Sequence, residues 1–259
     1  MRRFFLEKED ILSEKPTLRG PDVKHIRTVL RLKPGDDLFL FDGKGWEYRA
    51  LITASTSKAV VLSVVETFRS TSESPAQISI GQSLLKAKKM DNVVRQVTEV
   101  GAHALIPIMT QRSVPQPKPE RWAEKERRWR TIAWESLKQC GRSQTPRLDS
   151  PLSFGVLVRS SQAYNRRFIF HDDRAESALA TFTKETTKGL GVLALIGPEG
   201  GFTPEEVDMA LDAGFRCVSL GPRILKADTA VVAACTILQY LFGDMGHAQK
   251  TLDKPQGFQ

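Results

Sequence analysis

The stretch LALIGPEGGFTPEEVDMALDAGFRCVSLGPRILKADTAVVAACTILQYLF, residues 193–242, decides the fold of this chain. It opens with an unbroken apolar run, typical of a strand buried on both faces, and a glycine turn at 197–201 follows directly. A second apolar run, 215–220, leads into a second turn at 221–226. We therefore predict an α/β domain in which two buried strands are each followed by a turn and a helix.

The helix between these two strands carries agreeing start and stop signals. Thr203 suits the N-cap, Pro204 suits the first helical position, and Glu206 completes a capping box with Thr203. Gly214 suits the position just past the last turn. The spacing predicts a helix that begins after Thr203 and ends before Gly214.

Two strand-to-helix turns with the same geometry indicate one ligand site, because ligands of open α/β sheets bind beyond the carboxyl ends of the strands. Glycines allow backbone groups to approach a ligand closely. Neither turn matches a P-loop or GxGxxG, so the common nucleotide fingerprints are absent. The simpler alternative is that both are ordinary turns without a ligand.

Several motifs, in consistent order, closely resemble the RsmE family of SPOUT-class methyltransferases, which act on uracil N3 of 16S ribosomal RNA. The two C-terminal motifs are LIGPEGGFTPEE (195–206) and LGPRILKADTA (220–230). Upstream matches are MRRFF at the N-terminus, HIRTVLRLKPGD (25–36), GQSLLKAKKMDNVVRQVTEVGAHALIPIMTQRS (81–113) and WESLKQCGRSQTPRL (134–148). The chain departs from the family at Lys226 and Asp228, where Arg and Glu are usual.

This resemblance implies a PUA-like β-barrel domain for RNA binding at residues 1–70. The polar, serine-rich sequence that follows predicts a linker at 71–77. The resemblance also implies a SPOUT methyltransferase domain with a C-terminal trefoil knot at 78–245, and we expect a disordered tail at 246–259. The implied methyl donor is S-adenosylmethionine (SAM). The expected cofactor-binding residues are His171, Gly197, Glu199, Gly200, Gly201, Leu220, Gly221, Ile224, Leu225 and Thr229. Alternatively, Thr229 caps the last helix and makes no contact with the cofactor.

The residues alone predict a small β domain at the N-terminus. A turn at 34–37 and the Asp42-Gly43 signal separate short apolar runs, and 22–30 suits a short helix. Arg3 and Arg31 are candidate RNA contacts, although each could be an ordinary solvated charge.

Positive charge is concentrated in the middle of the chain. Of the net +8, the whole excess lies in residues 76–147, which hold 14 Lys and Arg against 6 Asp and Glu. Such a region suits a polyphosphate partner, and the resemblance implies that this partner is the 16S rRNA of the small ribosomal subunit. The candidate RNA contacts of this region are Lys86, Lys89, Arg112 and Gln139. The alternative is a solvated basic face without a partner.

Strand, helix and strand are predicted at 78–83, 89–100 and 104–109, with the two strands parallel. A long helix follows at 120–140. Its tryptophans, Trp122 and Trp129 among them, could stack on RNA bases, but we favour a role in the core or in packing between helices.

Uracil N3–H is weakly acidic, so a cation near O2 or O4 would favour its anion. We predict that Arg142 or Arg223 has this catalytic role. His171 with Asp172 and Asp173 could supply acid–base chemistry, but a loop role is the simpler interpretation. No general base is identified from the sequence.

The last helix is predicted to start at Asp228 or Thr229 and to end at Phe242. Its residues 230–242 are apolar on nearly every face, so it needs cover on all sides. The uncovered apolar surface predicts a partner subunit, and the resemblance implies a homodimer through the C-terminal knot region. No apolar run reaches about 18 residues and no signal peptide is evident, so we expect a cytoplasmic protein that does not enter membranes. Three scattered cysteines and four histidines show no metal pattern, so no metal is expected.

Two other functions stay open at this point. One is a non-catalytic RNA-binding or ribosome-assembly protein on the same scaffold, which would not need intact glycine turns. The other is a methyltransferase that acts on tRNA.

Overall fold

The computed structural model of the chain describes residues 2–86, 88–114, 119–172, 174, 177–178, 182 and 188–246. The chain forms two compact units. Unit 1 comprises the residues up to Glu73 together with Trp134–Thr145, and unit 2 comprises Ser74–Ala133 and the residues from Pro146 onward. Beyond residue 246, the predicted tail lies outside the described residues.

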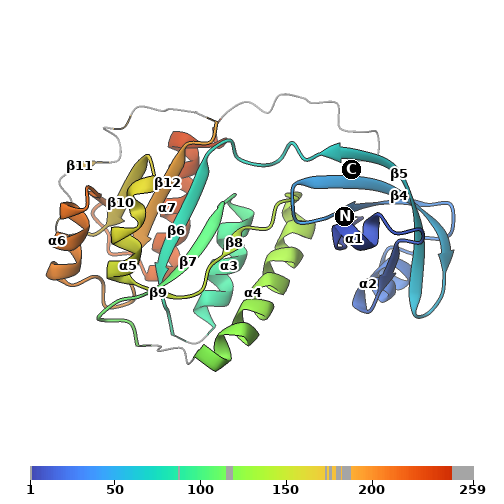
Figure 1. Ribbon diagram of the computed structural model, residues 1–259, viewed down its shortest axis with the longest axis horizontal. Helices are drawn as coiled ribbons and strands as arrows, with labels where there is room; N and C mark the ends of the chain where they lie inside the picture. The colour runs from blue at the N-terminus through green and yellow to red at the C-terminus, as the bar shows by residue number, and fades with distance from the viewer. Residues whose placement is uncertain are drawn as a thin grey trace. The chain divides into compact units, whose positions relative to one another are not determined.

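Unit 1 is built on a curled five-stranded sheet, in the order β1-β3-β4-β5-β2 (Figure 1). Its elements are β1 (Arg3–Phe5), α1 (Lys8–Ile11), β2 (Thr17–Arg19), α2 (Pro21–Lys24), the π-helical turn η1 (His25–Val29), β3 (Asp37–Phe41), β4 (Trp46–Ser55) and β5 (Ala59–Arg69). β3 and β4 pair antiparallel and form a hairpin at the Asp42-Gly43 signal noted in the sequence. Two register shifts between β4 and β5 mark bulges, which bend a sheet.

The predicted helix at 22–30 is only partly correct. The α-helix ends at Lys24, and the next five residues form a π-helical turn in which the Leu30 N–H donates to the His25 carbonyl. A π-turn needs one extra residue per turn, and apolar spacing at this length does not reveal it.

Unit 2 holds an eight-stranded sheet among its described residues, in the order β11-β13-β10-β12-β6-β7-β8, with β9 beside β7. Its strands are β6 (Gln77–Ser83), β7 (Ala104–Met109), β8 (Arg147–Leu148), β9 (Leu152–Ser153), β10 (Arg166–Phe170), β11 (Ser177–Ala178), β12 (Gly191–Ile196) and β13 (Arg216–Ser219). Every pairing is parallel, which confirms the α/β class and the predicted parallel pairing of β6 and β7.

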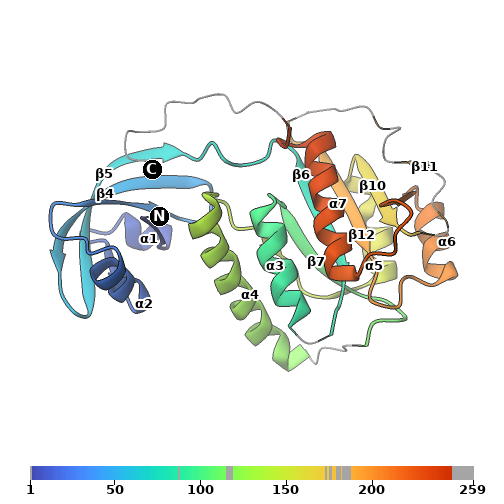
Figure 2. The same ribbon diagram turned by 180° about the vertical axis from the view of Figure 1, so that it is seen from behind.

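Helices cover both faces of this sheet. They are α3 (Lys89–Glu99), α4 (Pro119–Cys140), α5 (Phe154–Arg159), the 3-10 turn η2 (Ser161–Ala163), α6 (Pro204–Asp212) and α7 (Ala227–Phe242). α3 and α7 lie on one face, in front in Figure 2, and α5 and α6 lie on the other, in front in Figure 1.

Alternating residues of β12 divide between the two cores of unit 2. Val192, Ala194 and Ile196 pack with α3 and α7, whereas Leu193 and Leu195 pack with α5 and α6. A strand at this central position has no exposed face, which is why its sequence is continuously apolar.

The start and stop signals predicted for the helix between the two glycine turns are confirmed. The Thr203 hydroxyl accepts from the Glu206 N–H, and the Glu206 carboxylate accepts from the Thr203 N–H, so the predicted capping box is present. Gly214 follows the helix with a φ of 81°. The start predicted for the last helix is wrong by one or two residues, because Lys226 is the N-cap and Ala227 the first helical residue.

No helix among the described residues is both long enough and apolar enough to cross a membrane.

Candidate active site

Unit 2 has a cavity of about 660 Å³ at the carboxyl ends of three neighbouring strands. β10 and β12 end level, because Phe170 pairs with Ile196. On the other side of β10, Val218 of β13 pairs with the same Phe170. The segments that follow these strands therefore reach one edge of the sheet, where ligands bind in open parallel sheets.

Both glycine turns line this cavity. Eight of the ten expected cofactor-binding residues are found in its wall: His171, Gly197, Glu199, Gly200, Gly201, Leu220, Ile224 and Leu225. The prediction that the two turns share one site is thus met by the geometry. Contact of these residues with a cofactor stays a prediction.

Glycine is needed in the first turn because the chain folds tightly on itself. A Cβ added to Gly197 would lie 3.3 Å from the backbone Cα and C atoms of Gly201. Gly201 has a φ of 68°, which side chains other than glycine rarely adopt. The turn can therefore present backbone groups toward the cavity without intervening side chains.

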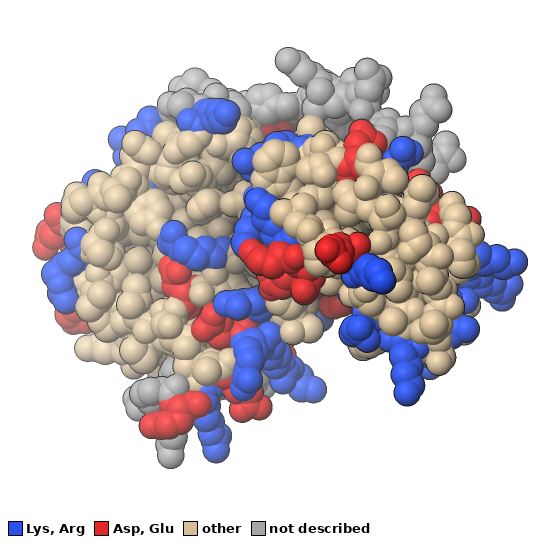
Figure 3. Space-filling model, turned by 45° about the vertical axis from the view of Figure 1, so that its right-hand side comes forward, with Lys and Arg blue, Asp and Glu red and all other residues tan. Residues whose placement is uncertain are grey.

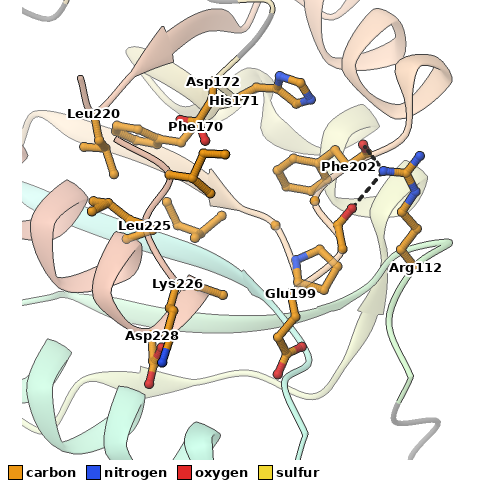
Figure 4. A pocket seen from close by; sticks show the side chains of 18 of the residues that line it. Arg112, Phe170, His171, Asp172, Glu199, Phe202, Leu220, Leu225, Lys226 and Asp228 are labelled. Carbon is orange, nitrogen blue, oxygen red and sulfur yellow. Dashed lines mark hydrogen bonds between the residues drawn. The ribbon is translucent and has the colours of Figure 1, made fainter. Parts of the chain in front are cut away.

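The cavity has an apolar part and a charged end (Figure 4). The side chains of Phe170, Phe202, Leu220 and Leu225 surround one space, and the carboxylates of Glu199 and Asp228 lie toward the lower end of the view. Lys89 and Lys226 add positive charge to the wall. This combination suits a ligand with a flat apolar portion and a charged portion.

An ion pair joins the first turn to the start of α3. Lys89 Nζ donates to Glu199 Oε1 over 2.9 Å, and the Lys86 N–H donates weakly to the same oxygen at 3.4 Å. The hydrogen bond with Glu199 raises the pKa of Lys89. Burial alone would raise the pKa of Glu199, but the hydrogen bonds from Lys89, its own backbone and Lys86 lower it. Both groups are charged at neutral pH, but the pair is partly exposed, so solvent screens it and it adds little to stability.

Arg112 holds the first turn from the other side. Its Nη1 donates to the carbonyl of Gly200 at 2.8 Å and more weakly to that of Phe202 at 3.3 Å, as Figure 4 shows. The neighbouring Gln111 N–H donates to Glu206 of the capping box. The segment after β7 and the turn after β12 are thus fixed to one another.

Three predicted residues of the second turn and the following helix do not line the cavity. Gly221, with a φ of 107°, and Arg223 are exposed next to lining residues. Thr229 is exposed in the first turn of α7, and its N–H donates to the Lys226 carbonyl. In Figure 4 the imidazole of the lining residue His171 points away from Phe170 and Leu220.

The predicted catalytic Arg142 belongs to unit 1 and is buried. Its guanidinium donates to Glu73 through Nε at 3.0 Å and Nη2 at 2.8 Å. Glu73 also accepts the N–H groups of Ser143 and Gln144. These bonds tie the end of the first sheet to the returning segment after α4.

Arg3 is buried in the same network, with 1% of its side chain exposed. It donates to Glu47 at 2.6 Å, to the Arg142 carbonyl and to the Ser143 hydroxyl. This geometry does not support its predicted RNA contact. Arg31, which has a φ of 55°, and Gln139 are both exposed in unit 1, as RNA contacts would need to be.

The tryptophans of α4 pack as favoured from the sequence. Trp122 and Trp129 are buried and meet edge to face, with ring centroids 5.2 Å apart. In unit 1, Trp134 stacks on Phe5 at 3.9 Å.

Charge on α4 and its surroundings is partly paired, as in Arg128–Asp91 and Arg130–Glu126. On the face shown in Figure 3, Lys and Arg accordingly alternate with Asp and Glu.

Sequence reasoning missed several residues of the cavity wall. These are Phe170, Asp172, Ile196, Pro198, Phe202, Lys226, Ala227, Asp228 and Ala230. Phe170 and Asp172 could have been found only with the strand order, which brings β10 between β12 and β13. Lys226 and Asp228 stand out as departures from the family pattern, and that is the signal that could have pointed to them. Asp173 lies outside the described residues.

Two family models match the chain. The RNA methyltransferase domain matches residues 72–239, and the RNA methyltransferase PUA domain matches residues 18–65. Ribosomal RNA small subunit methyltransferase E of Bacillus subtilis (strain 168) is 30% identical over 247 residues, which are 93% of this chain and 96% of the relative.

Solved structures with similar sequences have the same fold. Ribosomal RNA small subunit methyltransferase E from Neisseria gonorrhoeae, bound to S-adenosyl methionine, superposes with a TM-score of 0.81 at 30% identity, covering 95% of this chain and 99% of that one. A protein from Legionella pneumophila, in complex with the bound cofactor SAM, gives a TM-score of 0.82 at 30% identity, with 94% and 99% covered.

Proposed function

The chain belongs to the RsmE family of RNA methyltransferases, and from this premise we propose that it methylates N3 of one specific uridine in 16S rRNA. It is a SAM-dependent rRNA methyltransferase of the SPOUT class with a PUA-like unit 1. The observation that carries the proposal is the cavity shared by the two glycine turns.

The residues around the cavity fit SAM. Its volume falls within the range of about 300–1,000 Å³ of small-molecule sites, and its wall joins apolar side chains to exposed glycine backbone. The apolar residues Phe170, Leu220 and Leu225 would hold the adenine, and the first turn would offer backbone hydrogen bonds. When bound, SAM supplies an electrophilic methyl group.

We assign Arg223 to the target base. It is exposed in the second turn, between cavity residues Leu220 and Ile224. A guanidinium beside O2 or O4 would stabilise the uracil anion that attacks the methyl group. Arg142 has the same predicted role, but its guanidinium is engaged by Glu73, which favours a structural role.

We propose that each unit carries RNA contacts of its own. Arg31 and Gln139 would contact RNA from unit 1, and Lys86, Lys89 and Arg112 would do so from unit 2. All except Lys89 are exposed, and Lys89 is half-buried. The positive excess of residues 76–147 supports a polyphosphate partner.

We also propose a trefoil knot, a homodimer and a cytoplasmic location. The path supports the knot, since β13 lies beyond β10 whereas the following α7 packs back against α3, β6 and β12. Ile224 is 90% exposed and Tyr240 of α7 is 52% exposed, so the second turn and the last helix present apolar surface that a second copy could cover.

The test is a methylation assay with labelled SAM and, in separate reactions, small ribosomal subunits or tRNA that lack modification, followed by mapping of the labelled nucleotide. One N3-methyluridine in 16S rRNA is expected. Label found only in tRNA would favour the tRNA alternative, and absence of label in any RNA would favour the non-catalytic one.

A further inference from the structure

The first glycine turn is held by side chains that lie outside it. Arg112, just past β7, donates from Nη1 to the Gly200 carbonyl at 2.8 Å and more weakly to the Phe202 carbonyl at 3.3 Å. Its aliphatic stem runs beside Gly200, since a Cβ added there would lie 3.4 Å from the Cβ and Cδ of Arg112. At the start of the turn, Nε2 of Gln82 in β6 donates to the Gly197 carbonyl at 3.3 Å. Residues far away in the sequence therefore hold both ends of the turn.

The turn has few means of holding one shape by itself. Three of its five residues, 197–201, are glycine, which has the widest backbone freedom of any residue. The Gly201 N–H donates to the Pro198 carbonyl at 3.0 Å, and no second backbone hydrogen bond joins two described residues of the turn. A ligand that fits one conformation binds more weakly when that conformation is only partly populated. A side chain that selects this conformation therefore raises affinity without touching the ligand.

The segment that carries Arg112 is itself anchored. The Gln111 N–H donates to Glu206 Oε1 at 2.8 Å, which ties the segment to the capping box at the start of α6. The hydroxyl groups of Thr110 and Ser113 are hydrogen-bonded at 2.7 Å. Arg112 thus reaches the glycine turn from a fixed base at the end of a central strand.

We propose that Arg112 is a positioning residue of the cofactor site, which keeps residues 197–202 in the conformation that binds SAM. The assignment rests on the proposed function, in which this cavity holds SAM. Among the described residues, the hydrogen bonds of Arg112 are made by Nη1 alone. The rest of the guanidinium stays available, so this role adds to the RNA contact proposed for the same side chain and does not replace it.

Two other roles of Arg112 make different predictions. A contact with RNA alone would leave SAM affinity unchanged when no RNA is present. A direct contact with the carboxylate of SAM, which the place of Arg112 in the cavity wall would allow, would be missing in 5′-methylthioadenosine. That molecule keeps the adenosine and sulfur of SAM but lacks its amino-acid part. A positioning residue should matter to both ligands, because the turn and the residues proposed to hold the adenine line one cavity.

The experiment compares the full chain with Arg112→Met, which keeps an aliphatic stem and removes the donors and the charge. Calorimetry without RNA gives the dissociation constants of SAM and of 5′-methylthioadenosine. We expect both to rise about tenfold, the scale of one hydrogen bond from a charged group. With small subunits as substrate, the loss should appear in the KM for SAM, and saturating SAM should restore most of the lost rate. The thermal unfolding midpoint should stay close to that of the unsubstituted chain, since Arg112 is exposed.

The matched control is Arg166→Met. Arg166 is an exposed arginine that also donates to a backbone carbonyl, that of Asn165 at 3.4 Å, but at the amino end of β10, opposite the cavity. Its substitution should leave both dissociation constants unchanged.

Weaker binding of SAM alone by Arg112→Met would overturn the assignment in favour of direct contact with the amino-acid part of SAM. Unchanged affinity for both ligands would overturn it in favour of an RNA contact only. If the unsubstituted chain binds SAM but methylates no uridine N3, the proposed substrate is wrong, whereas the binding data still decide the positioning role.

Discussion

At the scale of single residues, the sequence shows which side chains are charged, but it does not show which of them are buried or paired. From the sequence, we predicted an RNA contact for Arg3 and a catalytic role for Arg142, but both residues are buried beside carboxylates. Their partners, Glu47 and Glu73, are 44 and 69 positions away in the chain. No local pattern signals such a pair, because it exists only after the first sheet and the segment after α4 have come together.

Arg142→Ala should lower the free energy of unfolding of the protein by about 1.5–3 kcal/mol, since it removes the charged hydrogen bonds to the part-buried carboxylate of Glu73. Urea unfolding followed by tryptophan fluorescence measures this, because Trp134 and Trp46 report on unit 1. Arg147→Ala is the control, as its pair with Asp149 is largely exposed and should matter by less than about 1 kcal/mol. If Arg142→Ala and Arg147→Ala are equally stable, the structural role assigned to Arg142 is wrong.

Arg223→Ala should lower the methyl-transfer rate about 10²–10³-fold and leave SAM affinity and stability unchanged, because the residue is exposed and acts on the developing anion. Single-turnover kinetics and calorimetry separate these effects. Arg159→Ala on α5, exposed and outside the cavity wall, serves as the control. Single-turnover kinetics like those of the unsubstituted chain would reject the catalytic role.

At the scale of elements, local signals were the reliable ones. The capping box of Thr203 and Glu206 and the stop at Gly214 depend on neighbours within one or two turns, so sequence spacing fixes them. The central strand β12 was evident from its continuous apolar run. The π-turn at His25–Val29 was not, and neither was the meeting of Arg112 with Gly200, which depends on the order of strands in the sheet.

Gly197→Ala tests whether the tight first turn is needed for the cofactor. The added methyl group would press on the Gly201 backbone and shift the turn, so SAM affinity should fall at least about tenfold, equal to 1.4 kcal/mol. Calorimetry gives the dissociation constant. Gly155→Ala is the matched control, since its Cβ would meet mainly the flexible end of Arg159. Undiminished affinity in Gly197→Ala would argue against this turn as the SAM site.

At the scale of the whole molecule, the motifs predicted the fold class of both units, but not which segments of the chain make up each unit. Unit 1 recruits Trp134–Thr145, which is separated by sixty residues of unit 2 from the rest of unit 1. Hydrophobic periodicity describes α4 as one helix and cannot show that its end belongs to another unit. The sheet order, in which β10 separates β12 from β13, likewise results from long-range pairing.

Tyr240→Asp tests the proposed homodimer. The side chain is 52% exposed on α7, so a charge there should be tolerated by the single subunit but should weaken an apolar contact between two copies. Light scattering after size-exclusion chromatography should show a dimer for the unsubstituted chain and a larger monomer fraction for the variant. Val29→Asp, an exposed apolar position in unit 1, should leave the dimer intact. A chain that is monomeric without substitution would refute the dimer.

The central claim is that two turns, each after a buried parallel strand, enclose one molecule of SAM. The most direct test is a crystal structure of the full chain grown with SAM. The account predicts density for the ligand between residues 197–201 and 220–225, with the adenine among Phe170, Leu220 and Leu225. SAM bound elsewhere, with this cavity containing only solvent, would contradict it.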